Sequence, residues 1–192
     1  MLLVQSVVNG FGSSVLAGYS AGGRVESIFI VPMIATGNAV STFTAQNLGA
    51  KNPERVKQGY HAAYKIIIAF AVVICIIANV FDHQILSAFV EDTSGIAFET
   101  GTTYVRFLGW FYAMIGFKAI TDGVLRGAGD VGVYMAANLL NLTTRVVFAN
   151  VCAPIFGVQA VWYAVPIGWT VNFVISFMWY MTGKWSRKNL VN

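Results

Sequence analysis

Residues 60–80, YHAAYKIIIAFAVVICIIANV, decide the fold class, because they hold one charged side chain, Lys65, in an otherwise apolar run. A bilayer core about 30 Å thick is crossed by roughly 20 apolar residues of α-helix. Lys65 lies near the start of the run, where its long stem can carry the ammonium group back to the interface. The stretch therefore predicts a transmembrane helix.

The composition extends this prediction to the whole chain. Of its 192 residues, 57% are hydrophobic and 10% are charged, whereas soluble domains carry about 25% charged residues. The mean hydropathy is +0.67, and no polar linker interrupts it, so we expect one membrane domain over residues 1–192. The net charge of +4 comes from short basic clusters between apolar spans, which does not indicate nucleic-acid binding.

Charges and Gly/Pro clusters divide the chain into six predicted spans, an all-α, six-transmembrane-helix bundle. A turn at Ala21-Gly22-Gly23-Arg24 would separate the first two spans, and Pro32 with Gly37 would kink the second. The mixed stretch Gln84–Thr103 suits a short surface helix. The six predicted spans are Met1–Ala21, Ser27–Leu48, Tyr60–Val80, Tyr104–Leu125, Val131–Cys152 and Val158–Met181.

The distribution of Lys and Arg gives an independent test of this count, because these residues concentrate in cytoplasmic loops. One side of the predicted topology holds Lys51, Arg55, Lys57, Lys65, Arg126, Lys184, Arg187 and Lys188. The other side holds Arg24 and Arg106 beside Glu26, Asp82, His83, Glu91, Asp92 and Glu99. We therefore predict that both termini are cytoplasmic.

Two cations fall inside predicted spans, where a charge is costly unless it is paired or reaches water. Lys118 can snorkel to the cytoplasmic face, which is the reading we favour for it. Arg145 lies about 14 residues into the fifth span, past the midplane at 1.5 Å per residue, and is expected to face a polar interior. Its role is either transport or a structural bond to helix carbonyls or to Asn141, one turn earlier.

A second group of candidates is neutral. Gln5 and Asn9 are four residues apart, and Asn138, Asn141 and Arg145 are three and four apart, so each set shares one helix face. Most such side chains join neighbouring helices, at about 0.6 kcal/mol each, but some can line a cavity. The residues proposed for a cavity wall are Gln5, Asn9, Asn38, Tyr112, Asn138, Asn141 and Arg145.

The sequence contains His and Cys residues, but their spacing does not indicate an active site or a metal site. His61 and His83 are isolated from carboxylate or cysteine clusters, and Cys75 and Cys152 have no metal-ligand spacing. No Ser/His/Asp arrangement is suggested. We expect a protein that is not an enzyme and needs neither a metal nor a cofactor.

Three segments together resemble the multidrug and toxic compound extrusion (MATE) family, especially its DinF-like branch. They are Gln5-Ser6-Val7-Val8-Asn9-Gly10-Phe11-Gly12, Ala45-Gln46-Asn47-Leu48-Gly49-Ala50 with Pro53-Glu54-Arg55-Val56, and Gly123-Val124-Leu125-Arg126-Gly127-Ala128-Gly129-Asp130. Their order and spacing, with Pro166-Ile167-Gly168-Trp169 in the last span, extend the resemblance over essentially the whole chain. Such proteins have two six-helix lobes, and the matched segments are similar to the second.

The resemblance implies part of a secondary exporter in a bacterial cytoplasmic membrane. It implies efflux of small amphipathic or cationic drugs by alternating access, driven by H⁺ or Na⁺, from a cavity between this lobe and a second one that the chain lacks, together with the start of its first helix. Asn141 stands where relatives commonly carry Glu, and the first predicted span has no acidic residue. The residues that bind the coupling ion therefore stay unassigned.

Two other functions stay open. A lipid-linked oligosaccharide flippase of the same superfamily would need a larger and more cationic cavity than Lys118 and Arg145 provide. A membrane scaffold that transports nothing would use its polar residues only to join helices.

Overall fold

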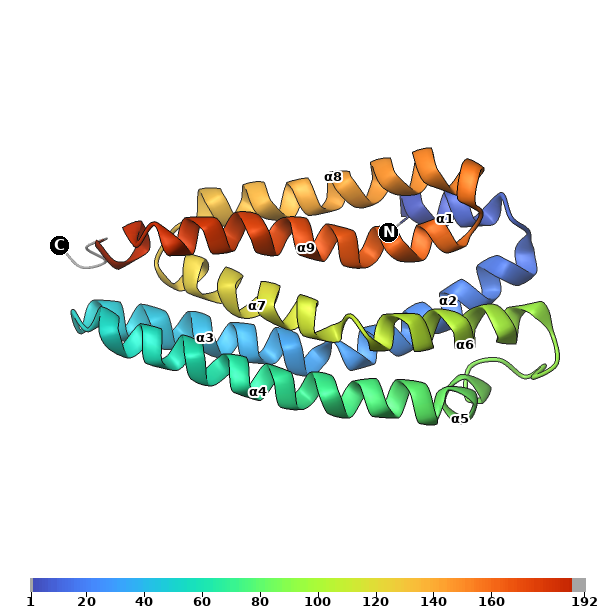
Figure 1. The fold of residues 1–192 in the computed structure, drawn as a ribbon, viewed down its shortest axis with the longest axis horizontal. Coiled ribbons are helices and arrows are strands. Elements are labelled where there is room, and N and C mark those ends of the chain that lie inside the picture. The colour runs from blue at the N-terminus through green and yellow to red at the C-terminus, as the bar shows by residue number, and fades with distance from the viewer. Residues whose placement is uncertain (1, 188–192) are drawn as a thin grey trace.

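The computed structural model describes residues 2–187, and it is helical throughout, with no strand among these residues (Figure 1). The helices run antiparallel along one long axis and form six columns within the described range, because α2 continues into α3 and α6 into α7. Their bounds are α1 Leu2–Asn9, α2 Ser13–Phe29, α3 Val31–Gly49, α4 Pro53–Val80, α5 Asp82–Ser87, α6 Ile96–Gly109, α7 Tyr112–Gly127, α8 Val131–Phe156, α9 Gln159–Met181 and the 3-10 helix Lys184–Arg187.

Four helical stretches in the described part of the chain are long and apolar enough to cross a membrane: Ser13–Gly49, α4, α8 and α9. The 37 residues of Ser13–Gly49 would extend about 55 Å at 1.5 Å per residue, more than a bilayer core needs. The α6–α7 column is interrupted at Trp110 and Phe111, between two shorter helices. The predicted all-α membrane bundle is confirmed.

Local sequence explains where the long helices begin and end. The Asn52 side chain caps α4 by accepting a hydrogen bond from the Arg55 N–H at 3.1 Å, and Pro53 follows in the first turn. Pro32 stands in the first turn of α3, so the predicted break near it falls at Ile30. Gly37, by contrast, lies inside α3 and packs against Ala119 of α7.

The predicted boundary between the first two spans is wrong. The chain turns at Gly10-Phe11-Gly12, where Gly12 adopts φ 110°, a left-handed conformation that glycine tolerates. Residues 21–24, predicted as a turn, lie in the middle of α2. The first predicted span is thus divided between α1 and α2, and its first residue lies outside the described range.

The surface helix predicted at Gln84–Thr103 is also wrong over its second half. Only the short α5 lies apart, while Ile96–Thr103 forms the start of α6 and packs along α2. A Cβ on Gly18 would collide with the carbonyl oxygen of Ala97, and one on Gly22 would come within 2.6 Å of the Tyr104 ring. Glycine at these positions allows α2 and α6 to approach closely.

The two ends of the bundle differ in charge, as the distribution of Lys and Arg predicts. The α3–α4 turn with Lys51, the α7–α8 turn with Arg126 and the last turn of α9 before Lys184 all lie at one end, on the left in Figure 1. The opposite end holds the acidic connection from Asp82 through Asp92. Lys188, predicted for the basic end, lies outside the described residues.

Candidate functional site

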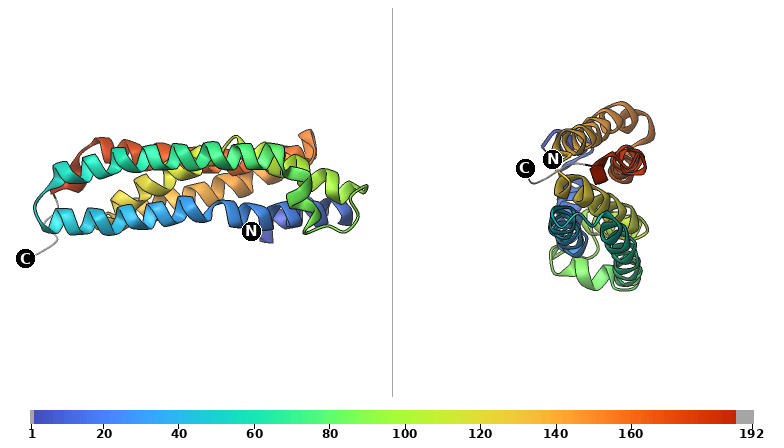
Figure 2. Two further views of the ribbon diagram at one scale, coloured as in Figure 1. Left: turned by 90° about the horizontal axis from the view of Figure 1, so that it is seen from below. Right: turned by 90° about the vertical axis from the view of Figure 1, so that its left-hand side faces the viewer.

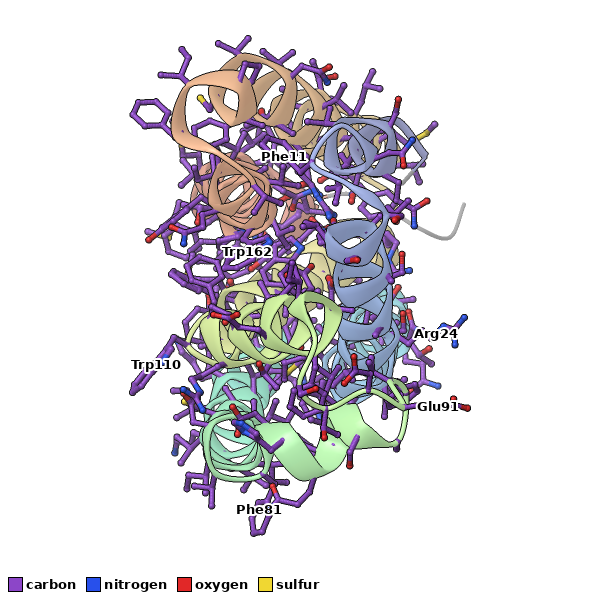
Figure 3. The ribbon with its side chains drawn as sticks, turned by 90° about the vertical axis from the view of Figure 1, so that its right-hand side faces the viewer. Phe11, Arg24, Phe81, Glu91, Trp110 and Trp162 are labelled. Carbon is purple, nitrogen blue, oxygen red and sulfur yellow. The ribbon has the colours of Figure 1, made fainter. Side chains whose placement is uncertain are left out.

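The polar residues border cavities on one side of the bundle. In Figure 2 (right) and Figure 3, α1, α2 and α3 lie along one side and α4 and α9 along the other, with α8 across the top beside α1 and α9. We call the first side the cavity face and define it by two cavities. The larger, of about 380 Å³, is lined by Gln5, Tyr19, Ser20, Gly23, Arg24, Glu26 and Ser27. The smaller, of about 210 Å³, is lined by Ile34, Gly37, Asn38, Lys118, Ala119, Asp122, Arg126 and Tyr134.

The larger cavity has a buried carboxylate in its wall. Glu26 on α2 is 5% exposed, and the Tyr104 hydroxyl on α6 donates a hydrogen bond to its Oε2 at 2.7 Å. The Tyr19 ring lies 5.0 Å from the Tyr104 ring. A carboxylate with so little access to water is expensive to keep ionised unless another charge compensates it.

Arg145 on α8 is a cation whose charge acts on Glu26, Tyr19 and Tyr104, although it forms no ion pair with Glu26 among the described residues. Arg145 is half-buried, and its stem lies over Gly168 of α9, where a Cβ would come within 2.5 Å of Arg145 Cγ. Gly168 therefore leaves the space in which the Arg145 stem packs against α9.

Two buried polar atoms near this group have no hydrogen-bond partner within residues 2–187. They are Asn141 Oδ1, beside the same Gly168 notch, and Trp162 Nε1. The Trp162 ring lies 6.1 Å from the Tyr104 ring, and Figure 3 shows it inside the bundle. The bond between Arg145 and Asn141 that the sequence allowed is not formed, since the Asn141 oxygen accepts none.

A second buried carboxylate lies along the same face. Asp122 on α7 is 3% exposed and binds Lys118 Nζ at 3.0 Å, Asn138 Nδ2 at 3.2 Å and Ser176 Oγ at 2.7 Å. Lys118 also donates to Asn138 Oδ1 at 3.0 Å. The favoured snorkelling of Lys118 is therefore wrong: its side chain is 15% exposed and is bonded to Asp122 on its own helix and to Asn138 on α8. Nearby, Arg126 donates to Asn38 Oδ1 at 2.8 Å.

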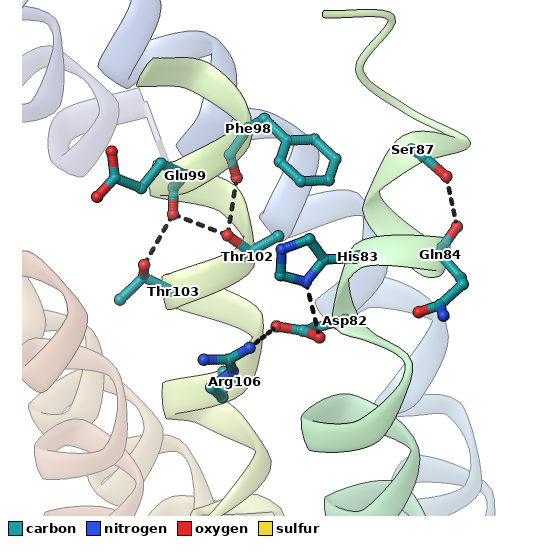
Figure 4. A network of polar contacts seen from close by, with 9 residues as sticks. All are labelled: Asp82, His83, Gln84, Ser87, Phe98, Glu99, Thr102, Thr103 and Arg106. Carbon is teal, nitrogen blue, oxygen red and sulfur yellow. Dashed lines mark hydrogen bonds and ion pairs between the residues drawn. The ribbon is translucent and has the colours of Figure 1, made fainter. Parts of the chain in front are cut away.

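A third cluster of polar side chains lies at the acidic end of the bundle, between α5 and α6 (Figure 4). Asp82 at the start of α5 accepts a hydrogen bond from Arg106 of α6 and lies 3.2 Å from His83 Nδ1. Burial alone would raise the pKa of Asp82, but the hydrogen bonds from His83 and Arg106 outweigh it and lower that pKa. This group joins α5 to α6 and lines neither cavity.

The seven predicted cavity residues separate into different surroundings. Gln5 lines the larger cavity, Asn38 lines the smaller one, and Asn138 and Arg145 belong to the two charged groups. Asn9 is the exposed last residue of α1, and Asn141 lies beside Gly168 of α9. Tyr112 is 1% exposed in the core, against Phe29 and Trp169. Their roles in transport stay predictions.

The sequence reading missed Glu26, because it placed this residue after a turn at the membrane surface. Gly18 and Gly22 stand four residues apart, the small-residue spacing of closely packed membrane helices. That spacing was the available signal that residues 18–26 form one helix face. A carboxylate on such a helix is a candidate functional residue.

Comparison with known proteins now identifies the family. The family model described as MatE matches residues 1–151. The chain belongs to the MatE family. Among curated relatives, this MatE chain is 27% identical over 191 residues to the probable multidrug resistance protein YpnP of Bacillus subtilis (strain 168). The match covers 99% of this chain and 42% of YpnP.

Two further matches have lower sequence identity but cover nearly as much of this chain. The probable multidrug resistance protein NorM of Thermotoga maritima is 22% identical, over 98% of this chain and 41% of NorM. A solved structure of the outward-facing conformation of a multidrug resistance MATE family transporter superposes with a TM-score of 0.89 at 22% identity. The superposition covers 98% of this chain and 43% of the chain in that structure, which shows a shared fold. The MatE chain thus spans about two fifths of the length of these relatives.

Proposed function

We propose that this MatE chain is the lobe of a secondary multidrug exporter that lies opposite a second six-helix lobe. The two lobes would enclose a cavity between them, and drug would leave the cytoplasm in exchange for inward H⁺ or Na⁺. The coverage of about two fifths of each relative supports one lobe. The names of the relatives support drugs as the class of substrate.

The observation that carries this proposal is the concentration of charge on the cavity face. Glu26 and Asp122 are both nearly inaccessible to water and both border cavities, although each lies in a membrane-length column of the bundle. Charged groups retained at membrane depth usually mark the path of an ion or a substrate. Transporters built from two bundles place such groups near the midplane, between the bundles.

The structure of α8 supports a missing partner on this face. Three of its 26 residues are buried, namely Ala137, Ala149 and Ala153. Arg145 and Asn138 on this helix belong to the two charged groups that border the cavities, and lipid would not solvate such side chains. A second lobe packed there would cover them, and opening and closing of the two lobes would expose the cavity to alternate sides.

The alternatives are less well supported. A flippase is not favoured by relatives that are named multidrug resistance proteins. A scaffold would give the cavity face no function beyond helix packing. Arg145→Leu separates these readings, because a transporter should lose drug flux while still folding, whereas a scaffold should lose assembly or stability.

The test is ethidium or norfloxacin efflux from drug-sensitive cells. Cells that express this chain alone should retain the drug, since one lobe has no opposite wall. Cells that express it fused after the first six helices of a relative such as YpnP should export the drug, and Arg145→Leu in that fusion should abolish export at unchanged protein level. Efflux by the chain alone, without a partner, would overturn the need for a second lobe.

A further inference from the structure

We infer that Glu26 is a protonation site of this lobe, and that Arg145, held over Gly168, replaces the proton as its partner when the proton leaves. The inference rests on the proposed function, because it names the coupling site of the same cavity. It concerns one proton equilibrium: the carboxyl group releases H⁺ into the cavity and becomes a carboxylate, with no other bond made or broken.

The first step is the surroundings of the carboxyl group. Glu26 lines the 380 Å³ cavity, so a proton can reach it, yet its side chain is almost entirely buried. Its partner within hydrogen-bond distance is the Tyr104 hydroxyl, a neutral group that serves a protonated or an ionised carboxyl. One neutral bond does not compensate a buried negative charge.

The second step concerns every helix that faces Glu26. α6 supplies Tyr104, α2 itself supplies Tyr19, α7 supplies Tyr112, and α8 supplies Arg145, all of which interact electrostatically with Glu26. α1 contributes the neutral Gln5 to the cavity wall, where Arg24 of α2 also lies. Of the two cations named here, Arg24 is on the same helix as Glu26, whereas Arg145 is on α8 and is half-buried.

The third step is the freedom of the Arg145 side chain to respond. With three buried residues in its length, α8 is held mainly by α9 and more lightly by α1 and α7. The Arg145 stem passes through the Gly168 notch, and its head is joined to no described side chain by a hydrogen bond or ion pair. The unpartnered Trp162 Nε1 and Asn141 Oδ1 lie on the same two helices. The Arg145 side chain can therefore turn toward α2 without breaking a hydrogen bond or ion pair of its own, while Asn138 keeps α8 bonded to α7.

The chemistry favours a proton over a metal cation. Hard cations take about six or more oxygen ligands, and no group of three or more acidic, His or Cys side chains that could hold a metal occurs in residues 2–187. Arg145 already contributes positive charge to the surroundings of the carboxylate, which disfavours a second cation there.

The experiment is an infrared titration of carboxyl C=O bands, using the purified full chain in lipid nanodiscs. Glu26→Gln should abolish one titrating band, and Glu26→Asp should retain it at a changed frequency, which shows that the site still folds. Arg145→Leu should move the titration midpoint of that band to higher pH, because removing a cation favours the neutral carboxyl. Gly168→Ala should act in the same direction, since the added methyl displaces the arginine stem.

The matched controls are Lys65→Leu, which removes a cation from an exposed site on α4, and Gly132→Ala, whose Cβ would meet nothing within 4 Å. Both should leave the midpoint unchanged. The inference is overturned if Glu26→Gln retains every titrating band, if Arg145→Leu shifts nothing, or if replacing choline by Na⁺ at constant pH displaces the proton. Because no drug is present, failure here leaves the efflux test independent.

Discussion

At the residue scale, the charges inside the bundle are paired, and pairing explains why an apolar chain retains them. Lys118 and Asp122 stand four residues apart on α7, so they face the same side of one helix. Asn138 and Ser176 then satisfy the remaining groups from α8 and α9. Fully bonded groups of this kind tie three helices to one register, whereas removal of either Lys118 or Asp122 leaves the other as an unpaired buried charge.

Lys118→Met should therefore destabilise the chain by about 3–5 kcal/mol, the usual effect of leaving one charge of a buried pair alone. The measurement is unfolding of the purified chain in mixed micelles. The double variant Lys118→Met/Asp122→Asn should regain part of the loss, because no charge is then left unpaired. Lys65→Met serves as the control, and an equal loss in both single variants would contradict the pairing argument.

At the scale of elements, the contact of α2 with α6 decides where Glu26 lies. Gly18 and Gly22 bring the two backbones close together, and this approach carries Tyr104 to the Glu26 carboxyl. The same device joins α3 to α7, where a Cβ on Gly123 would collide with the carbonyl oxygen of Gly37. The two interrupted columns are thus packed against each other along their length.

Gly18→Ala should cost about 1–3 kcal/mol, the range for a methyl forced into a well-packed contact. Gly23→Ala lies one turn further along α2 and meets nothing within 4 Å, so it should be neutral or stabilise the helix by up to about 1 kcal/mol. Thermal unfolding of the two variants side by side gives the comparison. A Gly18→Ala variant as stable as Gly23→Ala would show that α2 and α6 are not closely packed.

At the scale of the whole molecule, the basic end defines how the bundle sits in the membrane. Glu54 beside the α3–α4 turn and Lys184 after α9 lie at the same end, and Ser94 in the α5–α6 connection lies at the other. The excess of Lys and Arg at the first end predicts that it faces the cytoplasm.

Cysteine accessibility tests this orientation. After Cys75→Ala and Cys152→Ala, the variant Ser94→Cys should react with a membrane-impermeant maleimide in intact cells. Glu54→Cys and Lys184→Cys should react only after the cells are permeabilised. Labelling of Glu54→Cys and Lys184→Cys from opposite sides of the membrane would invalidate the topology and, with it, the exporter.

The sequence by itself determined that this chain is a helical membrane bundle, that its basic turns share one end, and that it resembles the MATE family. Hydropathy and charge are local properties. The transmembrane helix at residues 60–80 and the basic turn at Lys51 can therefore be predicted without knowing which helices pack against them. Only the tertiary structure decided the position of Glu26 and the pairing of Lys118. Ala21-Gly22-Gly23 is consistent either with a turn or with a close helix contact, and the choice depends on whether another helix packs against those glycines.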